Sequence, residues 1–249
     1  MSTRIVIHPD ADTVAAAVAA QLASEVIDRQ SRMAPVHLVL TGGTVGIKTL
    51  EQLATSATAS AIDWSGVHLW WGDERFLPEG DPERNETQAR EALINGLGDA
   101  LPAVNVHYVP RPGESGIETP EDAAREYATE LAKFANEGEA VPSFDILLLG
   151  VGPDGHIASL FPGNSALGAS GAAVGVHDAP KPPPQRVSLT FDAINNARNV
   201  WLVVAGADKA AAVASAWSGS PVEQTPAGHV HGAEETLWVV DEAASQKLW

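Results

Sequence analysis

The chain has 249 residues and a net charge of −17, and its apolar fraction of 45% and aromatic fraction of 6% are ordinary for a globular protein, so disorder is not expected. It contains no cysteine, so disulfides, thiolate nucleophiles and cysteine-based metal sites are excluded. The acidic charge disfavours nucleic acid and membrane surfaces as partners. Because no apolar run approaches the roughly 18 residues of a membrane span and the N-terminus lacks a signal-peptide pattern, we expect a cytoplasmic protein.

Short apolar and β-branched runs alternate with helical patterns, which indicates βα units around a mainly parallel sheet. The expected strands cover residues 4–8, 36–40, 67–71, 104–109, 144–149, 200–205 and 237–240. The run at 145–149 is continuously apolar after its aspartate, which is typical of a central strand covered on both faces. The fold class expected is therefore α/β, with helices on both faces of the sheet.

Two long helices are expected between these strands. An apolar residue at every fourth position from Val14 to Val26 predicts a helix over residues 12–29. The sequence Thr-Pro-Glu-Asp at 119–122 carries a capping hydroxyl, an early proline and acidic residues, and predicts a helix that reaches about residue 136. The proline-rich residues 179–185 predict a rigid surface connection. With no repeat and no linker visible, we expect one domain over residues 1–249.

Ligands of open α/β sheets bind beyond the carboxyl ends of the strands, so the residues that follow each strand are candidate site residues. The first such segment is Thr-Gly-Gly-Thr-Val-Gly at 41–46, whose backbone amides could bind an anion at a helix start. An ordinary strand-to-helix turn is the alternative. The second is Trp-Trp-Gly-Asp-Glu-Arg at 70–75, where three consecutive charges suggest a site residue among Asp73, Glu74 and Arg75.

The third segment covers residues 150–163 and holds Asp154 and His156 in a glycine-rich turn. Its G-x-G-x-x-G spacing could indicate a dinucleotide site, but Pro153 and Asp154 interrupt the run of amides and little helix can follow before Pro162. A histidine in this place can act as a base near neutral pH. No nucleophile elbow occurs, so Ser159 is a poor nucleophile and water is the expected one.

The fourth segment supplies cations, with Arg186 before Val-Ser-Leu-Thr and Lys209 in Gly-Ala-Asp-Lys at 206–209. Two cations facing a glycine loop would suit a phosphate group. Solvated surface charges are the alternative for each.

Together these segments resemble the 6-phosphogluconolactonase family, in the superfamily that also includes glucosamine-6-phosphate isomerases and deaminases. The resemblance covers nearly the whole chain and is most specific at 150–163, which matches G-x-G-x-D-G-H-x-A-S-L-F-P-G in full. Further matches are Trp71–Arg75, Pro78, Asn85, Arg186–Thr190, Gly206 and Lys209. The glycine loop departs from the family pattern, because Val45 replaces a hydroxyl residue and Gly46 a proline.

The resemblance implies a Rossmann-like fold that hydrolyses 6-phospho-D-glucono-1,5-lactone to 6-phospho-D-gluconate, without metal or organic cofactor. His156 would activate water, Asp154 would orient its imidazole or polarise the substrate, and Arg75 would stabilise developing negative charge. Phosphate and sugar contacts are expected from Gly42, Gly43, Thr44, Asp73, Asn85, Arg186 and Lys209. The only partner expected is the sugar phosphate lactone, and the chain is expected to be a monomer or weak homo-oligomer.

Two alternative functions predict sequence features that differ from those of a lactonase. An aminosugar-phosphate deaminase shares the Asp-Gly-His turn but should carry an acidic residue shortly after the histidine, and residues 157–163 contain none. A non-catalytic sugar-phosphate sensor should carry a DNA-binding module, whereas this acidic chain begins almost directly with an expected strand.

Overall fold

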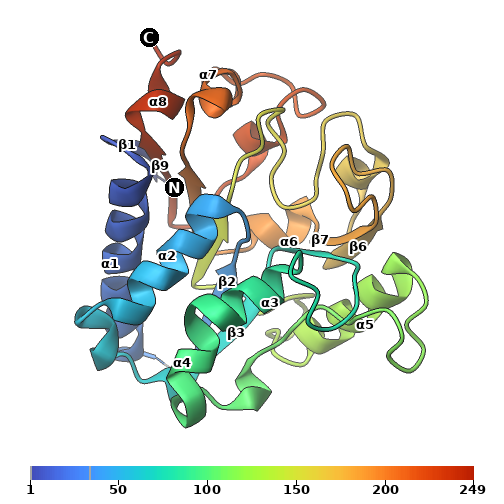
Figure 1. The fold of residues 1–249 in the computed structure, drawn as a ribbon. Coiled ribbons are helices and arrows are strands. Elements are labelled where there is room, and N and C mark those ends of the chain that lie inside the picture. Colours follow the sequence, from blue (N-terminus) through green and yellow to red (C-terminus); the bar gives the residue numbers. More distant parts are fainter. Residues whose placement is uncertain (1, 34) are drawn as a thin grey trace.

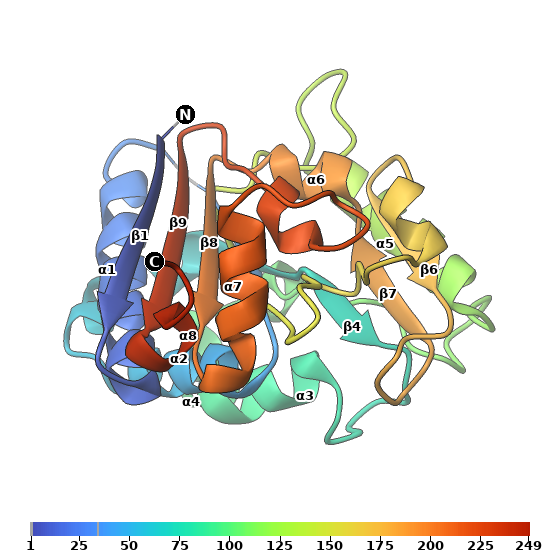
Figure 2. The ribbon, with the colours of Figure 1, turned by 90° about the horizontal axis from the view of Figure 1, so that it is seen from above.

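The main sheet consists of six parallel strands in the order β1-β9-β8-β5-β2-β3. The structure is a computed structural model that describes residues 2–33 and 35–249. The strands are β1 Ser2–His8, β2 Val36–Leu40, β3 Val67–Trp71, β5 Ile146–Leu149, β8 Asn199–Val204 and β9 Glu235–Asp241. In Figure 2, β1, β9 and β8 run side by side, and helix α7, Ala210–Trp217, lies next to β8. The expected α/β fold with a parallel sheet is confirmed.

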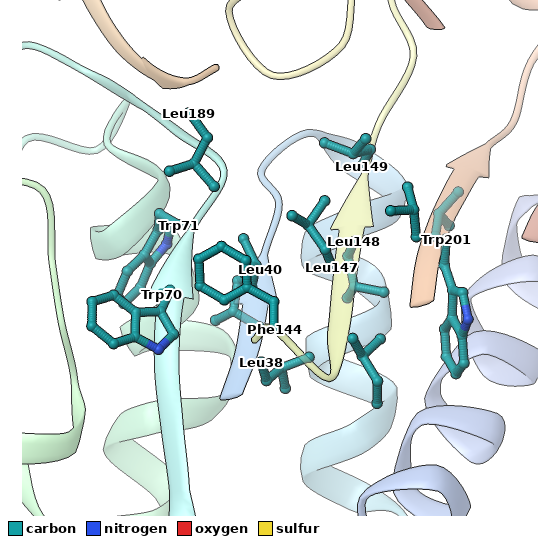
Figure 3. Packing of buried hydrophobic residues seen from close by; sticks show 14 of the residues in the cluster. Leu38, Leu40, Trp70, Trp71, Phe144, Leu147, Leu148, Leu149, Leu189 and Trp201 are labelled. Carbon is teal, nitrogen blue, oxygen red and sulfur yellow. The ribbon is translucent and has the colours of Figure 1, made fainter. Parts of the chain in front are cut away.

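Strand β5 lies inside the sheet, between β8 and β2, as its apolar run predicts. Every residue of β2, β5 and β8 is buried, because helices cover both faces of the parallel sheet. Figure 3 shows the three leucines Leu147, Leu148 and Leu149 of β5 between side chains of β2 and Trp201 of β8. The rigid centre of the sheet therefore positions the turn that follows Leu149.

Helix α1, Ala11–Gln30, begins where the sequence predicts, because the carboxylate of Asp10 accepts a hydrogen bond from the backbone N of Thr13 at 2.8 Å. Its apolar stripe from Val14 to Val26 is buried, and α1 packs beside α2, Thr44–Thr55, in Figure 1. Burial of each such side chain contributes about 1.5–3 kcal/mol. On the other face, Trp217 of α7 packs edge-on against Trp238 of β9, with ring centroids 6.5 Å apart.

The remaining helices are α2 Thr44–Thr55, α3 Asn85–Ala89, α4 Asn95–Leu97, α5 Pro120–Ala132, α6 Phe191–Asn195, α7 Ala210–Trp217 and α8 Glu242–Ser245. Helix α5 opens with the predicted cap, in which Thr119 and Asp122 bond reciprocally. It ends at Ala132, and turns replace the last residues of the expected helix. No helix in the described ranges is long and apolar enough to cross a membrane.

The expected strand at 104–109 is wrong. Residues 103–105 form a 3₁₀ turn, and Val106 makes only one isolated bridge to Leu69 of β3. Val104 is 80% exposed, so its β-branched side chain contributes nothing to the core. Pro110 has no backbone N–H with which to extend the pairing along β3.

A second, antiparallel sheet was not predicted. It contains β4 Asp73–Arg75, β7 Arg186–Leu189 and β6 Ala173–Val176, in the order β4-β7-β6. A hydrogen bond joins this sheet to the main sheet: the backbone N of Leu189 in β7 donates to the carbonyl of Gly72, which follows β3 directly. Buried apolar side chains of both sheets form one cluster. Its β4–β7 register pairs Asp73 with Ser188 and Arg75 with Arg186, which brings two of the predicted site segments together.

Candidate active site

A cavity of about 260 Å³ lies at the carboxyl ends of β2 and β5. From β2 the chain continues to β3, and from β5 it continues to β8 on the opposite side, so the two loops diverge and leave a crevice between them. Eight of the ten predicted site residues line the cavity: Gly42, Gly43, Asp73, Arg75, Asn85, His156, Arg186 and Lys209. The residues that follow different strands are therefore brought to one place.

His156 and Asp154 form a hydrogen-bonded pair, with 2.5 Å between Nδ1 of the imidazole and Oδ1 of the carboxylate. The imidazole also packs against the ring of Phe161, at 4.4 Å between centroids. Burial favours the neutral form of Asp154, but the hydrogen bond and charge of His156 outweigh it and lower the pKa of Asp154 to about 2. A carboxylate acceptor keeps the proton on Nδ1, so Nε2 is left as the nitrogen that can accept a proton.

The turn that carries this pair depends on two glycines. Gly155 has a φ of +85°, a conformation that side chains rarely adopt. A Cβ on Gly152 would lie 2.0 Å from Nδ1 of His156 and 2.5 Å from Oδ1 of Asp154. The backbone N of Gly152 donates to the carbonyl of His156, which closes the turn. Asp154 itself borders a neighbouring cavity and reaches the site through His156.

Asp73 is a buried carboxylate on the cavity wall, and two side chains orient it. The hydroxyl of Ser159 donates to its Oδ2 at 2.7 Å, and Nδ2 of Asn85 donates to its backbone carbonyl at 2.8 Å and its Oδ1 at 3.3 Å. Ser159 is fully buried, which agrees with its rejection as a nucleophile. Its contact with Asp73 was missed, although its place three residues after His156 is a signal that could have suggested a role.

Glu74 does not belong to the site, because alternate residues of a strand face opposite sides. Its side chain is completely buried and accepts hydrogen bonds from the backbone N–H groups of Arg75, Asn85 and Glu86. Burial, opposed by the charge of Arg84, raises the pKa of Glu74 to about 7. Through these hydrogen bonds, Glu74 of β4 holds the first residues of α3 in place.

The cations Arg75, Arg186 and Lys209 all line the cavity. Nη1 of Arg75 donates to the carbonyl of Glu83, and its Nε is buried with no hydrogen-bond partner among the described residues. Burial lowers the pKa of Arg186, and the charge of Asp73 opposes that effect. Lys209 pairs with Asp208 at 3.2 Å. A fourth cation, Lys181, lines the same cavity and was not predicted.

The glycine loop lies on the cavity wall beside Asn85. A Cβ on Gly42 would lie 1.9 Å from Oδ1 of Asn85, so only glycine fits there. Gly43, with a φ of +81°, is the N-cap of α2. Thr44 begins α2 and lines two adjacent cavities instead of this one. Val45 also faces one of those adjacent cavities, so its departure from the family pattern lies outside the site.

Comparison with known proteins agrees with this geometry. The family model for glucosamine-6-phosphate isomerases/6-phosphogluconolactonase matches residues 9–238. A 6-phosphogluconolactonase of Streptomyces coelicolor is 49% identical over 98% of this chain and 94% of its own, and one of Mycobacterium leprae is 45% identical over 100% and 99%. The structure of 6-phosphogluconolactonase from Trypanosoma brucei covers 100% of this chain and 99% of its own, with a TM-score of 0.83 and 25% identity. The chain therefore belongs to the glucosamine-6-phosphate isomerase/6-phosphogluconolactonase family.

Proposed function

We propose that this protein hydrolyses 6-phospho-D-glucono-1,5-lactone to 6-phospho-D-gluconate. The observation that carries the proposal is the pairing of His156 with Asp154 at a cavity that also holds Arg75, Arg186 and Lys209. The pair can activate water, and the cations suit a substrate with a phosphate group. The names of the two relatives of 45–49% identity support the same activity.

The reaction needs one base that later acts as an acid. Nε2 of His156 takes a proton from water while the water oxygen forms a bond to C1 of the lactone. The carbonyl oxygen becomes an oxyanion, which the guanidinium of Arg75 stabilises from the cavity wall. Collapse of this intermediate breaks the bond from C1 to the ring oxygen, and the imidazolium returns its proton to that oxygen. The product acid then ionises and releases one proton to solvent.

Asp73 accepts hydrogen bonds from the sugar hydroxyls in this proposal, with Ser159 as a positioning residue. We expect Ser159→Ala to lower kcat/KM roughly 5- to 30-fold, chiefly through KM, because a charge-assisted hydrogen bond that orients Asp73 is lost. Steady-state kinetics with the lactone check this. Ser245→Ala is the matched control, since it also removes a buried hydroxyl, but one that donates to the carbonyl of Glu242 and does not line the cavity. Equal losses in both variants would contradict the role of Ser159.

Arg186, Lys209 and the glycine-loop residues Gly42, Gly43 and Thr44 hold the 6-phosphate in this proposal. Charge-assisted contacts contribute about 1.5–3 kcal/mol each, so Arg186→Ala or Lys209→Ala should lower kcat/KM by roughly 10- to 150-fold. With unphosphorylated gluconolactone, the wild type should be poor and the variants little worse. If a variant lost the same factor on both lactones, its cation would act elsewhere than on the phosphate.

The deaminase alternative is less favoured, because Asp73 is the only carboxylate on the wall of the cavity in the described residues. Purified protein can be tested on both substrates, with acid release from fresh 6-phosphogluconolactone and ammonia release from glucosamine 6-phosphate. Acid without ammonia is expected. Ammonia without acid would reverse the assignment.

Domain organisation, cellular location and oligomeric state are part of the same proposal. We propose that residues 1–249 act as one domain, which the hydrophobic cluster shared by the two sheets supports. A cytoplasmic location and a monomer or weak homo-oligomer without a nucleic acid partner are also proposed, on the composition and the charge of −17.

A further inference from the structure

Residues 178–185 connect β6 to β7 and form a proline-rich segment, here called the strap (Figure 2). Four of its eight residues are proline, and Lys181 lies between two of them. A hydrogen bond of 3.1 Å from the backbone N of Ala179 to the carbonyl of Pro184 closes it. Proline fixes its own φ and restricts the residue before it, so the backbone of Lys181 has little freedom to lose when a ligand binds.

Arg186 holds the strap at the cavity. Its Nε donates to the carbonyl of Pro183 at 2.8 Å, and its Nη2 donates to the carbonyls of Lys181 and Pro182 at 3.0 and 3.1 Å. Arg186 is itself buried and lines the cavity. The position of Lys181 is thus tied to the predicted phosphate ligand Arg186, and not to the turn that carries His156.

The charge of Lys181 is not compensated within the protein. Lys48, Lys133 and Lys209 each pair with a carboxylate, whereas Lys181 forms no ion pair with any residue in the described ranges. Its side chain is exposed at the cavity wall. Four of the 15 Lys and Arg residues of this acidic chain line the cavity, where Asp73 is the only carboxylate among residues 2–33 and 35–249. Such a concentration of like charge is suited to a ligand with more than one negative charge.

We propose that Lys181 is a further substrate-binding residue, which contacts the phosphate group of the lactone together with Arg186 and Lys209. The strap supplies this cation in a preorganised position, and the contact selects phosphorylated over unphosphorylated lactones. This inference rests on the proposed function, since it assigns the same cavity to a sugar phosphate.

The kinetic test compares Lys181→Gln with Lys181→Arg. We expect Lys181→Gln to raise KM for 6-phosphogluconolactone roughly 5- to 10-fold with kcat changed by less than about twofold, because one charge-assisted contact is lost. The effect should be smaller than that of Arg186→Ala, since Lys181 is exposed to solvent and Arg186 is buried. Lys181→Arg, which keeps the charge, should restore most of the affinity. Lys247→Gln is the matched control, since Lys247 is also exposed and also forms no ion pair in the described part of the chain. It should behave as the wild type.

Binding of inorganic phosphate, measured by calorimetry, gives a second test that does not need turnover. Lys181→Gln should weaken it by a similar factor, and Lys247→Gln should not. An unchanged KM and phosphate affinity in Lys181→Gln, an equal loss of kcat/KM on gluconolactone, or no phosphate binding by the wild type would each overturn the inference. If phosphate binding depends on Lys181 but the wild type hydrolyses neither lactone, the proposed function fails while the phosphate contact stands.

Discussion

Replacing His156 with alanine is expected to lower kcat by roughly 10²- to 10⁴-fold, the range typical of losing a general base. The imidazole is the group that takes the proton from water and later protonates the ring oxygen, and Asp154 fixes its orientation at 2.5 Å. The fold should remain, because the side chain lies on a loop at the cavity and not in the apolar cluster. Steady-state kinetics with 6-phosphogluconolactone and a thermal melt measure the two effects.

His231→Ala is a suitable control for this prediction, since His231 is an exposed histidine away from the cavity. It should leave kcat unchanged. An unchanged rate in His156→Ala would assign the base to Asp73 or Asp154 instead.

A second large effect is expected from a single methyl group. Gly152→Ala places a Cβ 2.0 Å from Nδ1 of His156 and 2.5 Å from Oδ1 of Asp154, so both side chains must move. Because misplacement of a catalytic group by about 1 Å can cost on the order of 10²-fold, we expect a loss of kcat of at least that size. The atoms displaced belong to side chains at the cavity, so the melting temperature should change little.

Gly96→Ala separates this geometric effect from a general effect of adding a methyl group. Gly96 lies in α4, and a Cβ added there meets no atom within 4 Å. It should retain full activity. If Gly152→Ala also retained it, the pairing of His156 with Asp154 would not be needed for turnover.

Much of the fold could be predicted because its strands are buried on both faces. The apolar runs of β2, β5 and β8 identify strands, and the carboxyl ends of parallel strands meet at one edge of the sheet. Residues as far apart as Gly42, after β2, and Lys209, after β8, could therefore be assigned to one site from the sequence. The run at 104–109 is also rich in valine, but it pairs with β3 at one residue only.

The antiparallel sheet and the contacts that depend on it could not be predicted in this way. Strand β4 is three residues long and all three residues are charged, so it lacks the alternation of apolar and polar residues that indicates a strand. The bond from Ser159 to Asp73 joins residues 86 positions apart, and the position of Lys181 depends on carbonyl groups held by Arg186. These features follow from tertiary contacts and not from local sequence.

The most direct test of the central claim is the rate of acid release from freshly prepared 6-phosphogluconolactone, measured at constant pH for the wild type and His156→Ala in parallel. Hydrolysis of the lactone liberates one proton per turnover, and the spontaneous reaction provides the baseline. We predict that the wild type releases acid far above this baseline and that His156→Ala falls back toward it. Acid release by the wild type at the spontaneous rate would contradict the account.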